Sequence, residues 1–350
     1  MRTLAVVGGG VIGLSTAWRA AESGWQVTLF DPAVASGASW VAGGMLAPLS
    51  EGWPGEEQPL ELGAASLARW PEFASRLSAD VICAEGSLTV ALDAADADDL
   101  RTVAEWVGAQ GHELHLLTRA EIRELEPSLG RGARLGLLAP TELAVDNRRL
   151  LDALRDAAVA AGVVIVAAAV QDLEALTVDQ VVLAAGEQSP QLWPGLPVRP
   201  VKGEIVRLRA RAGVTPAPSR VVRARVHGRP VYLVPRGDGI VVGATQYESG
   251  RDTQVTVAGV RDLIADAETL MPAIGEYELA ETIAGLRPMT PDNLPLIGRL
   301  TDRVVVATGH GRNGILLSPI TVDAVLALLD GTSVVEDKSA DPERFSGASA

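Results

Sequence analysis

The sequence of 350 residues contains only one cysteine, Cys83, and fewer basic than acidic residues. A single cysteine cannot form a disulfide within the chain, which suits a reducing compartment and predicts a cytoplasmic protein. Lysine and arginine number 30 against 44 aspartates and glutamates, for a formal net charge of −14 at pH 7. This balance argues against nucleic acid or an anionic membrane as a partner, because both attract basic patches. An anionic ligand would have to be held by a few local cations.

Long hydrophobic runs are also missing. The longest, residues 157–170, is shorter than the roughly 20 residues of a membrane span, and Gly162 divides it, so we expect no membrane association. The first residues, "MRTLAVVGGGVIGLSTA", could be read as a signal peptide, but a strand followed by a glycine turn explains each glycine. His112 and His115 have metal-ligand spacing without further histidine or cysteine beside them, so we predict no metal site.

The chain does contain an alternation of strands and helices at both ends, with a strand-rich block between them. The pattern predicts a strand, a helix and a parallel strand within residues 3–31, a helix around 61–80, and a helix that is entered from Thr118 and stopped by Pro127. It also predicts a helix that begins at Asp146 or Asn147, and a strand over 163–170. We therefore predict an α/β protein in which one domain is interrupted by insertions of another.

The first glycine loop has the form G-x-G-x-x-G, with Gly8, Gly10 and Gly13 between the first strand and helix. The three glycines permit a tight turn, the approach of a pyrophosphate to the backbone, and close packing of helix on strand. Asp31 ends the second strand, where an acid takes a ribose hydroxyl. Together these features predict a dinucleotide site, the alternative being a glycine-rich turn without a ligand.

A second glycine loop, "ATGHGRNG" at 307–314, also lies between a predicted strand and helix. Alone it would be an ordinary strand-to-helix turn. Together with the first loop it suits a long cofactor such as FAD, with the adenine half near residues 8–31 and the isoalloxazine near the second loop. A helix N-terminus there would stabilise the negative charge of a reduced flavin.

Six stretches carry a resemblance to a known family: "GGGVIG" with Asp31, "AGGMLAP" (42–48), "PVKGE" (200–204), "VYLVPR" (231–236), "GLRPMTPDNLPLIG" (285–298) and "GHGRNGILLSP" (309–319). The chain resembles, from residue 1 to about 335, the glycine oxidases of thiamine biosynthesis, a branch of the D-amino-acid oxidase and sarcosine oxidase flavoproteins. The resemblance implies non-covalent FAD in a discontinuous Rossmann-like domain (1–83, 141–200 and 286–337). It implies an antiparallel-sheet, α+β substrate domain (84–140 and 201–285), and the polar residues 338–350 would form a loose tail.

The resemblance also assigns residues. Arg287 would hold the substrate carboxylate, Tyr232 would hydrogen-bond it, Arg312 would lie close to the flavin, and Met45 and Gln246 would shape the substrate pocket. FAD would be contacted by Gly8, Gly10, Val11, Ile12, Gly13, Asp31, Ala38, Ser39, Gly43, Gly44, Met45, Val170, His310, Gly311, Arg312, Asn313, Gly314, Ile315 and Leu316.

The implied reaction is oxidation of glycine, sarcosine, D-alanine or D-proline by hydride transfer to flavin N5. Oxygen becomes hydrogen peroxide, and the imine becomes glyoxylate and ammonia or passes to thiazole synthase. A homotetramer is implied as well. Two alternatives remain: a dehydrogenase that passes electrons to a quinone or carrier protein, and a flavoprotein that only binds a partner. Gln246 departs from the family, which often has methionine there, and Cys83 lies far from the region of covalent flavin attachment.

Arg287 itself precedes Pro288, which favours an extended backbone, and Pro291 and Pro295 stiffen the segment after it. A guanidinium on such a platform can grip a carboxylate with two parallel hydrogen bonds. The alternative is a solvated surface arginine. Tyr232 could equally serve strand packing, and Met45 could be core filler.

Overall fold

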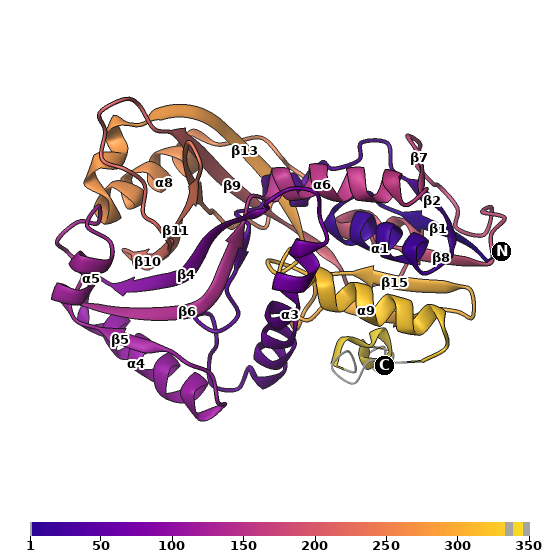
Figure 1. Ribbon diagram of the computed structural model, residues 1–350, viewed down its shortest axis with the longest axis horizontal. Coiled ribbons are helices and arrows are strands. Elements are labelled where there is room, and N and C mark those ends of the chain that lie inside the picture. Colours follow the sequence, from indigo (N-terminus) through magenta and orange to yellow (C-terminus); the bar gives the residue numbers. More distant parts are fainter. Residues whose placement is uncertain (1, 333–338, 346–350) are drawn as a thin grey trace.

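The computed structural model describes residues 2–332 and 339–345, and within them two β-sheets lie side by side (Figure 1). The six-stranded sheet has the order β14–β15–β8–β1–β2–β7 and is parallel except for β14. Its strands are β1 (Thr3–Val7), β2 (Gln26–Phe30), β7 (Val164–Val166), β8 (Gln180–Leu183), β14 (Leu296–Arg299) and β15 (Val304–Thr308).

One layer of helices covers this sheet. The helix α1 (Val11–Glu22) lies between α6 (Asn147–Ala160) and α9 (Ser318–Leu329), as Figure 1 shows. Apolar residues of all three pack with the strands into one continuous core, which includes Leu14, Leu150, Ile320 and Leu29. The strands β1, β8 and β15 are buried almost throughout, as a parallel sheet requires.

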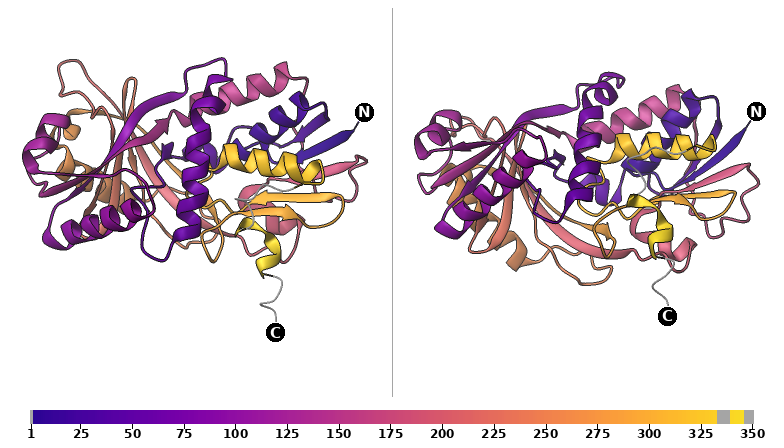
Figure 2. Two further views of the ribbon diagram at one scale, coloured as in Figure 1. Left: turned by 60° about the horizontal axis from the view of Figure 1, so that its bottom comes forward. Right: turned by 90° about the horizontal axis from the view of Figure 1, so that it is seen from below.

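The second sheet has nine strands within the described residues and is largely antiparallel. Its order is β13–β9–β12–β11–β10–β4–β6–β3, and β5 pairs with β6. The strands are β3 (Met45–Leu46), β4 (Ile82–Ala91), β5 (His115–Leu117), β6 (Leu135–Val145), β9 (Arg199–Arg209), β10 (Val221–Val226), β11 (Arg229–Arg236), β12 (Gly239–Gly243) and β13 (Glu278–Met289). The helices α4 (Ala94–Ala109), α5 (Arg119–Leu125) and α8 (Val257–Leu270) pack around it, and α3 (Glu57–Ser75) stands between the two sheets (Figure 2). Two short helices, α2 (Gly37–Val41) and α7 (Ser189–Leu192), complete the fold.

This architecture confirms the predicted fold class, and several helix ends follow the local sequence. Asp146 caps α6, since its carboxylate accepts hydrogen bonds from the backbone N–H groups of Arg148 and Arg149. Asn147 instead turns inward and donates to the carbonyls of Ser39 and Trp40. Thr118 caps α5 at the predicted position and forms a capping box with Glu121.

Other expectations differ from the structure. The helix expected around 61–80 begins earlier and ends at Ser75, and the strand expected over 163–170 is paired only over Val164–Val166. The strand β13 continues across the expected domain limit at 285/286. Its last residue, Met289, pairs with His310 of the second glycine loop. Within the expected loose tail, Ala340 is buried and Arg344 pairs with Asp292 at 2.7 Å, so residues 339–345 are packed. Residues 333–338 and 346–350 of these expectations lie outside the described part.

Candidate functional site

A cavity of about 690 Å³ lies between the two sheets and is lined by residues from both, within the size range of ligand pockets. Nearly all residues that the sequence assigned to a site line this cavity. They are Gly8, Gly10, Val11, Ile12, Asp31, Ala38, Ser39, Gly43, Gly44, Met45, Val170, Tyr232, Gln246, Arg287, His310, Gly311, Arg312, Asn313, Gly314 and Ile315. The remaining two, Gly13 and Leu316, lie behind the cavity wall.

Gly13 and Leu316 have structural contacts that explain their positions. A Cβ atom on Gly13 would come within 1.8 Å of the carbonyl oxygen of Gly8, so this glycine allows α1 to pack against the loop. Leu316 is buried, and its carbonyl oxygen accepts hydrogen bonds from Ser66 Oγ at 2.7 Å and Trp70 Nε1 at 2.9 Å. Leu316 therefore anchors the second glycine loop to α3.

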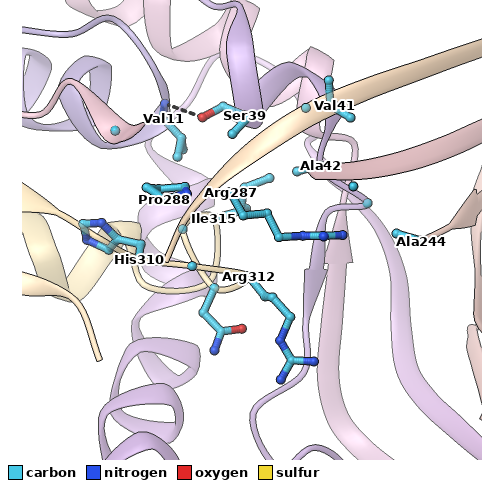
Figure 3. A pocket seen from close by; sticks show the side chains of 18 of the residues that line it. Val11, Ser39, Val41, Ala42, Ala244, Arg287, Pro288, His310, Arg312 and Ile315 are labelled. Atoms are coloured by element: carbon cyan, nitrogen blue, oxygen red, sulfur yellow. Dashed lines mark hydrogen bonds between the residues drawn. The ribbon is translucent and has the colours of Figure 1, made fainter. Parts of the chain in front are cut away.

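The loop between β1 and α1 forms one end of the cavity. Gly8 has φ +110°, and a Cβ atom there would lie 2.4 Å from the carbonyl oxygen of Ala184, so only glycine fits. The first turn of α1 opens toward the cavity, where Val11 N–H donates to Ser39 Oγ at 3.1 Å (Figure 3). Asp31 accepts from Gly9 N–H at 2.6 Å and Ala33 N–H at 2.7 Å. A bare glycine loop, a helix N-terminus and a fixed carboxylate fit the pyrophosphate and ribose of a dinucleotide.

The second glycine loop forms the middle of the cavity. Gly311 N–H donates to the carbonyl of Pro288 at 2.9 Å, which ties this loop to the end of β13. His310 is buried and its Nε2 lies 3.0 Å from Thr321 Oγ1. In Figure 3 its ring points away from Arg287, and burial lowers the pKa of His310 to about 3, so the ring stays neutral. This residue therefore offers its backbone, and not a charge, to the cavity.

Arg287 projects from β13 into the cavity (Figure 3). Its Nη1 donates to the carbonyl oxygen of Thr245 at 3.1 Å. Burial is the largest influence on this guanidinium and lowers the pKa of Arg287 from its usual value. The guanidinium lies over Gly203, where a Cβ atom would come within 2.5 Å of its Cζ and both Nη atoms. The Arg287 guanidinium therefore lies in the cavity above a glycine, Gly203, that the sequence did not single out.

Tyr232 lies on β11 with its ring between two glycines. A Cβ atom on Gly43 would lie 2.9 Å from the ring, and one on Gly243 would lie 2.2 Å from the hydroxyl oxygen. Burial raises the pKa of Tyr232, so its hydroxyl keeps its proton and can donate a hydrogen bond. The opposing electrostatic influence of Arg287 on this hydroxyl shows that the two groups share one region of the cavity.

Met45 and Gln246 also line this region. Met45, on β3, is partly buried and packs with the apolar cluster that includes Tyr232. Gln246 lies on an exposed loop, which the backbone pairing of Lys202 with Tyr247 holds at 2.9 Å in both directions. The side chain of Lys202 is buried and pairs with Asp252 at 2.6 Å and Glu204 at 3.3 Å. Lys202, to which the sequence assigned no role, therefore anchors the loop of Gln246.

A network of charged groups that was not predicted from the sequence also lines the cavity near Arg287. Glu51 accepts from Arg223 Nη2 at 2.6 Å and lies 3.3 Å from Arg312 Nη2. Glu142 on β6 is fully buried. It accepts hydrogen bonds from four groups on adjacent segments of the same chain: the backbone N–H groups of Leu49 and Ser50 and the hydroxyls of Ser50 and Ser87. The one signal in the sequence was an isolated acid in the apolar strand "LGLLAPTELAV".

Two further observations concern metals and membranes. In residues 2–332 and 339–345, no three or more histidine, cysteine, aspartate or glutamate side chains are grouped to hold a metal ion. Over the same residues, no helix combines the length and the apolarity that a membrane crossing needs.

A Rossmann-like sheet, a glycine loop at a helix N-terminus and a cavity that continues under a second sheet define the class: a dinucleotide-binding α/β protein. Comparison with known proteins agrees. The model of the FAD dependent oxidoreductase family, DAO, matches residues 3–327, and the chain belongs to this family. FAD is therefore the cofactor, and the residues described above fit it.

Individual relatives are similar over most of the chain. The bifunctional protein ThiO/ThiG of Synechocystis sp. is 35% identical over 93% of this chain and 51% of that protein. A glycine oxidase of Geobacillus kaustophilus is 33% identical over 91% of this chain and 90% of that protein. The crystal structure of glycine oxidase from Geobacillus kaustophilus superposes with a TM-score of 0.90 at 30% identity, covering 98% of this chain and 99% of that one. The chain spans about half the length of the bifunctional relatives. These similarities confirm the resemblance seen in the sequence.

Proposed function

We propose that this chain is an FAD-dependent oxidase of glycine and other small amines and amino acids, namely sarcosine, D-alanine and D-proline. The observation that carries the proposal is the guanidinium of Arg287. It is directed into the cavity, and within the described residues its one hydrogen-bond acceptor is the carbonyl of Thr245. Its remaining N–H groups can bind a carboxylate with two parallel hydrogen bonds. The names of the glycine oxidase relatives support this assignment.

The protein contributes mainly orientation. Arg287 and the Tyr232 hydroxyl would hold the substrate carboxylate from two sides, and the second glycine loop would hold the flavin nearby. FAD, when bound, supplies the acceptor for the hydride that leaves the α-carbon of the substrate. Fixing the α-carbon relative to that acceptor removes the entropic cost of bringing the two together. No acid–base side chain is needed for this step.

Among the described residues beside Arg287, no side chain is suited to accept the proton of the substrate amine. Two candidate acceptors line this part of the cavity: Glu51, whose pKa the neighbouring Arg223 and Arg312 hold below its usual range against the effect of burial, and Tyr232, whose raised pKa keeps it protonated. The ring of a third, His310, points away from Arg287 and is neutral with a pKa of about 3. None of the three is suited to accept a proton near neutral pH. We infer that the substrate reacts as the neutral amine that solution equilibrium supplies.

The expected products follow from this chemistry. Glycine, oxygen and water would give glyoxylate, ammonia and hydrogen peroxide. The imine formed before hydrolysis could instead pass to a thiazole synthase, as the fused name ThiO/ThiG of three relatives suggests. A homotetramer in the cytoplasm with non-covalent FAD remains our expectation. Cys83 does not line the cavity, and its Sγ accepts a hydrogen bond from Arg236 Nη1 at 3.4 Å.

The proposal is tested by removing the carboxylate clamp. Arg287→Ala should raise KM for glycine by about 100-fold or more, because two charged hydrogen bonds at ~1.5–3 kcal/mol each are lost. The flavin should stay bound, since the first glycine loop is untouched. Arg261→Ala is the matched control, because this arginine is 71% exposed on α8. Glycine kinetics within threefold of wild type for Arg287→Ala would reject the clamp.

A further inference from the structure

The part of the cavity around Arg287, where the substrate is proposed to bind, holds more positive charge than a substrate with one carboxylate requires. Three guanidiniums, of Arg287, Arg223 and Arg312, line it together with one carboxylate, Glu51. The electrostatic influences on Glu51 come from these three arginines. With glycine bound at Arg287, one positive charge would remain unbalanced. In a chain with a net charge of −14, such a concentration of arginines marks a place for an anion.

The other acidic side chains of the cavity do not neutralise this cluster. Asp31 is bound to the first glycine loop, and Glu187 pairs with Arg251 at 3.1 Å. Asp99 pairs with Arg225, and Asp96 lies beside that pair on α4. Asp31, Glu187 and Asp99 thus have partners outside the cluster, and the nearest cation to Asp96 is Arg225 rather than Arg223 or Arg312.

Arg223 is placed beside the expected substrate. It lies on β10 directly opposite Tyr232 on the antiparallel strand β11, so both side chains face the cavity from neighbouring positions. Its Nη1 donates to Ser50 Oγ at 3.1 Å and its Nη2 to Glu51 at 2.6 Å. The side chain is only 18% exposed, so its position is fixed before any ligand binds.

Glu51 leaves much of the binding capacity of the two arginines unused. It offers one oxygen to Arg223 and the other to Arg312, the second contact being the longer at 3.3 Å. Each guanidinium has five N–H donors in a planar fork. Within the described chain, no other partner of Arg312 is found, and Arg223 has only Ser50 besides. Glu142 fixes Ser50 and so preorganises the wall that carries the cluster.

We propose that Arg223 and Arg312, bridged by Glu51, form a second anion subsite, which takes a second carboxylate of the amino-acid substrate. This inference rests on the proposed function and extends it: amino acids with one carboxylate at Arg287 and another on the nitrogen substituent or side chain would be oxidised more efficiently than counterparts that lack the second carboxylate. Glu51 limits this preference, because its charge competes with the second carboxylate for the same donors.

The test compares matched substrates that differ by one carboxylate: iminodiacetate against sarcosine, and D-aspartate against D-alanine. In the FAD-loaded enzyme, kcat/KM should be higher for the dicarboxylate of each pair. Arg223→Gln should lower the ratio of kcat/KM values within a pair by about tenfold, the value of one charged hydrogen bond. Glu51→Gln should shift the same ratio upward, because two guanidiniums are then released. Arg261→Gln, which changes an arginine that is 71% exposed on α8, is the control and should leave the ratio unchanged.

The outcomes separate the two proposals. If none of these compounds or glycine reduces the flavin, the proposed function itself fails. If sarcosine and D-alanine are oxidised but neither dicarboxylate is preferred, or if Arg223→Gln and Glu51→Gln move the ratio in the same direction, only the second subsite is rejected. Should Arg223→Gln not retain FAD, the upward shift in Glu51→Gln alone decides, and its absence overturns the inference.

Discussion

Gly203→Ala tests the position of the Arg287 guanidinium without touching the arginine. Gly203 lies on β9 next to β13, and an added Cβ atom would lie 2.5 Å from the guanidinium carbon. The nearest ordinary van der Waals contact is 3.4 Å, so the guanidinium must move by about 0.9 Å. The fold should tolerate this, because the displaced atoms form the end of a flexible side chain.

The expected effect on catalysis follows from that displacement. A misplacement of about 1 Å in a positioning group can cost on the order of 100-fold in rate. We therefore expect kcat/KM for glycine to fall by about 100-fold in Gly203→Ala. Thermal stability should hold or rise slightly, because glycine inside a strand is less stable than alanine by roughly 0.5–1 kcal/mol.

Steady-state kinetics, flavin content and thermal unfolding would be measured on the same samples. Gly108→Ala is the control, since a Cβ atom there meets nothing within 4 Å. In an Arg287→Ala background, Gly203→Ala should have little further effect, because its target is gone. Kinetics within threefold of wild type for the single variant would refute the geometry, as would an equal loss in both backgrounds.

Three further outcomes follow from the cavity wall. Tyr232→Phe should keep its ring between the two glycines yet raise KM for glycine about tenfold through loss of one hydrogen bond to a charged group, and an unchanged KM would leave Tyr232 a packing role. Because the pKa of His310 is about 3 and that of Tyr232 is raised, log kcat/KM for glycine should increase with pH up to the pKa of the substrate amine; a limb near pH 6–7, typical of an ordinary histidine at about 6.5, would contradict this. Glu142→Ala should leave buried donors unsatisfied and destabilise the protein by at least about 3 kcal/mol, so a melting temperature equal to that of wild type would show that these hydrogen bonds are replaced.

The site was predictable where its chemistry is local in the sequence. The two glycine loops lie within short stretches whose residue types and spacing together predict a dinucleotide site, whereas the carboxylate role of Arg287 came from the family resemblance and stays a proposal. Asp146 and Thr118 were predicted as helix caps for the same reason, because a cap depends on residues two or three positions away.

The features that could not be predicted depend on residues far apart in the chain. Gly203 lies under a guanidinium 84 positions later, and Arg223 meets a glutamate 172 positions earlier. Gly203 and Arg287 meet through the pairing of β9 with β13, and Arg223 meets Glu51 only when β10 is brought beside the loop after β3. The short extent of β7 has a similar cause, since its pairing ends where its neighbour in the described sheet, β2, ends at Phe30.

The central claim is that this chain oxidises a small amino acid held by Arg287 beside its flavin. The most direct measurement is anaerobic: the purified FAD-loaded protein is mixed with glycine while the visible flavin absorbance is followed. We predict that the flavin is bleached, that air restores the colour with formation of hydrogen peroxide, and that Arg287→Ala requires far more glycine for the same change. No bleaching by glycine, sarcosine or small D-amino acids would contradict the account and leave only the FAD-binding fold.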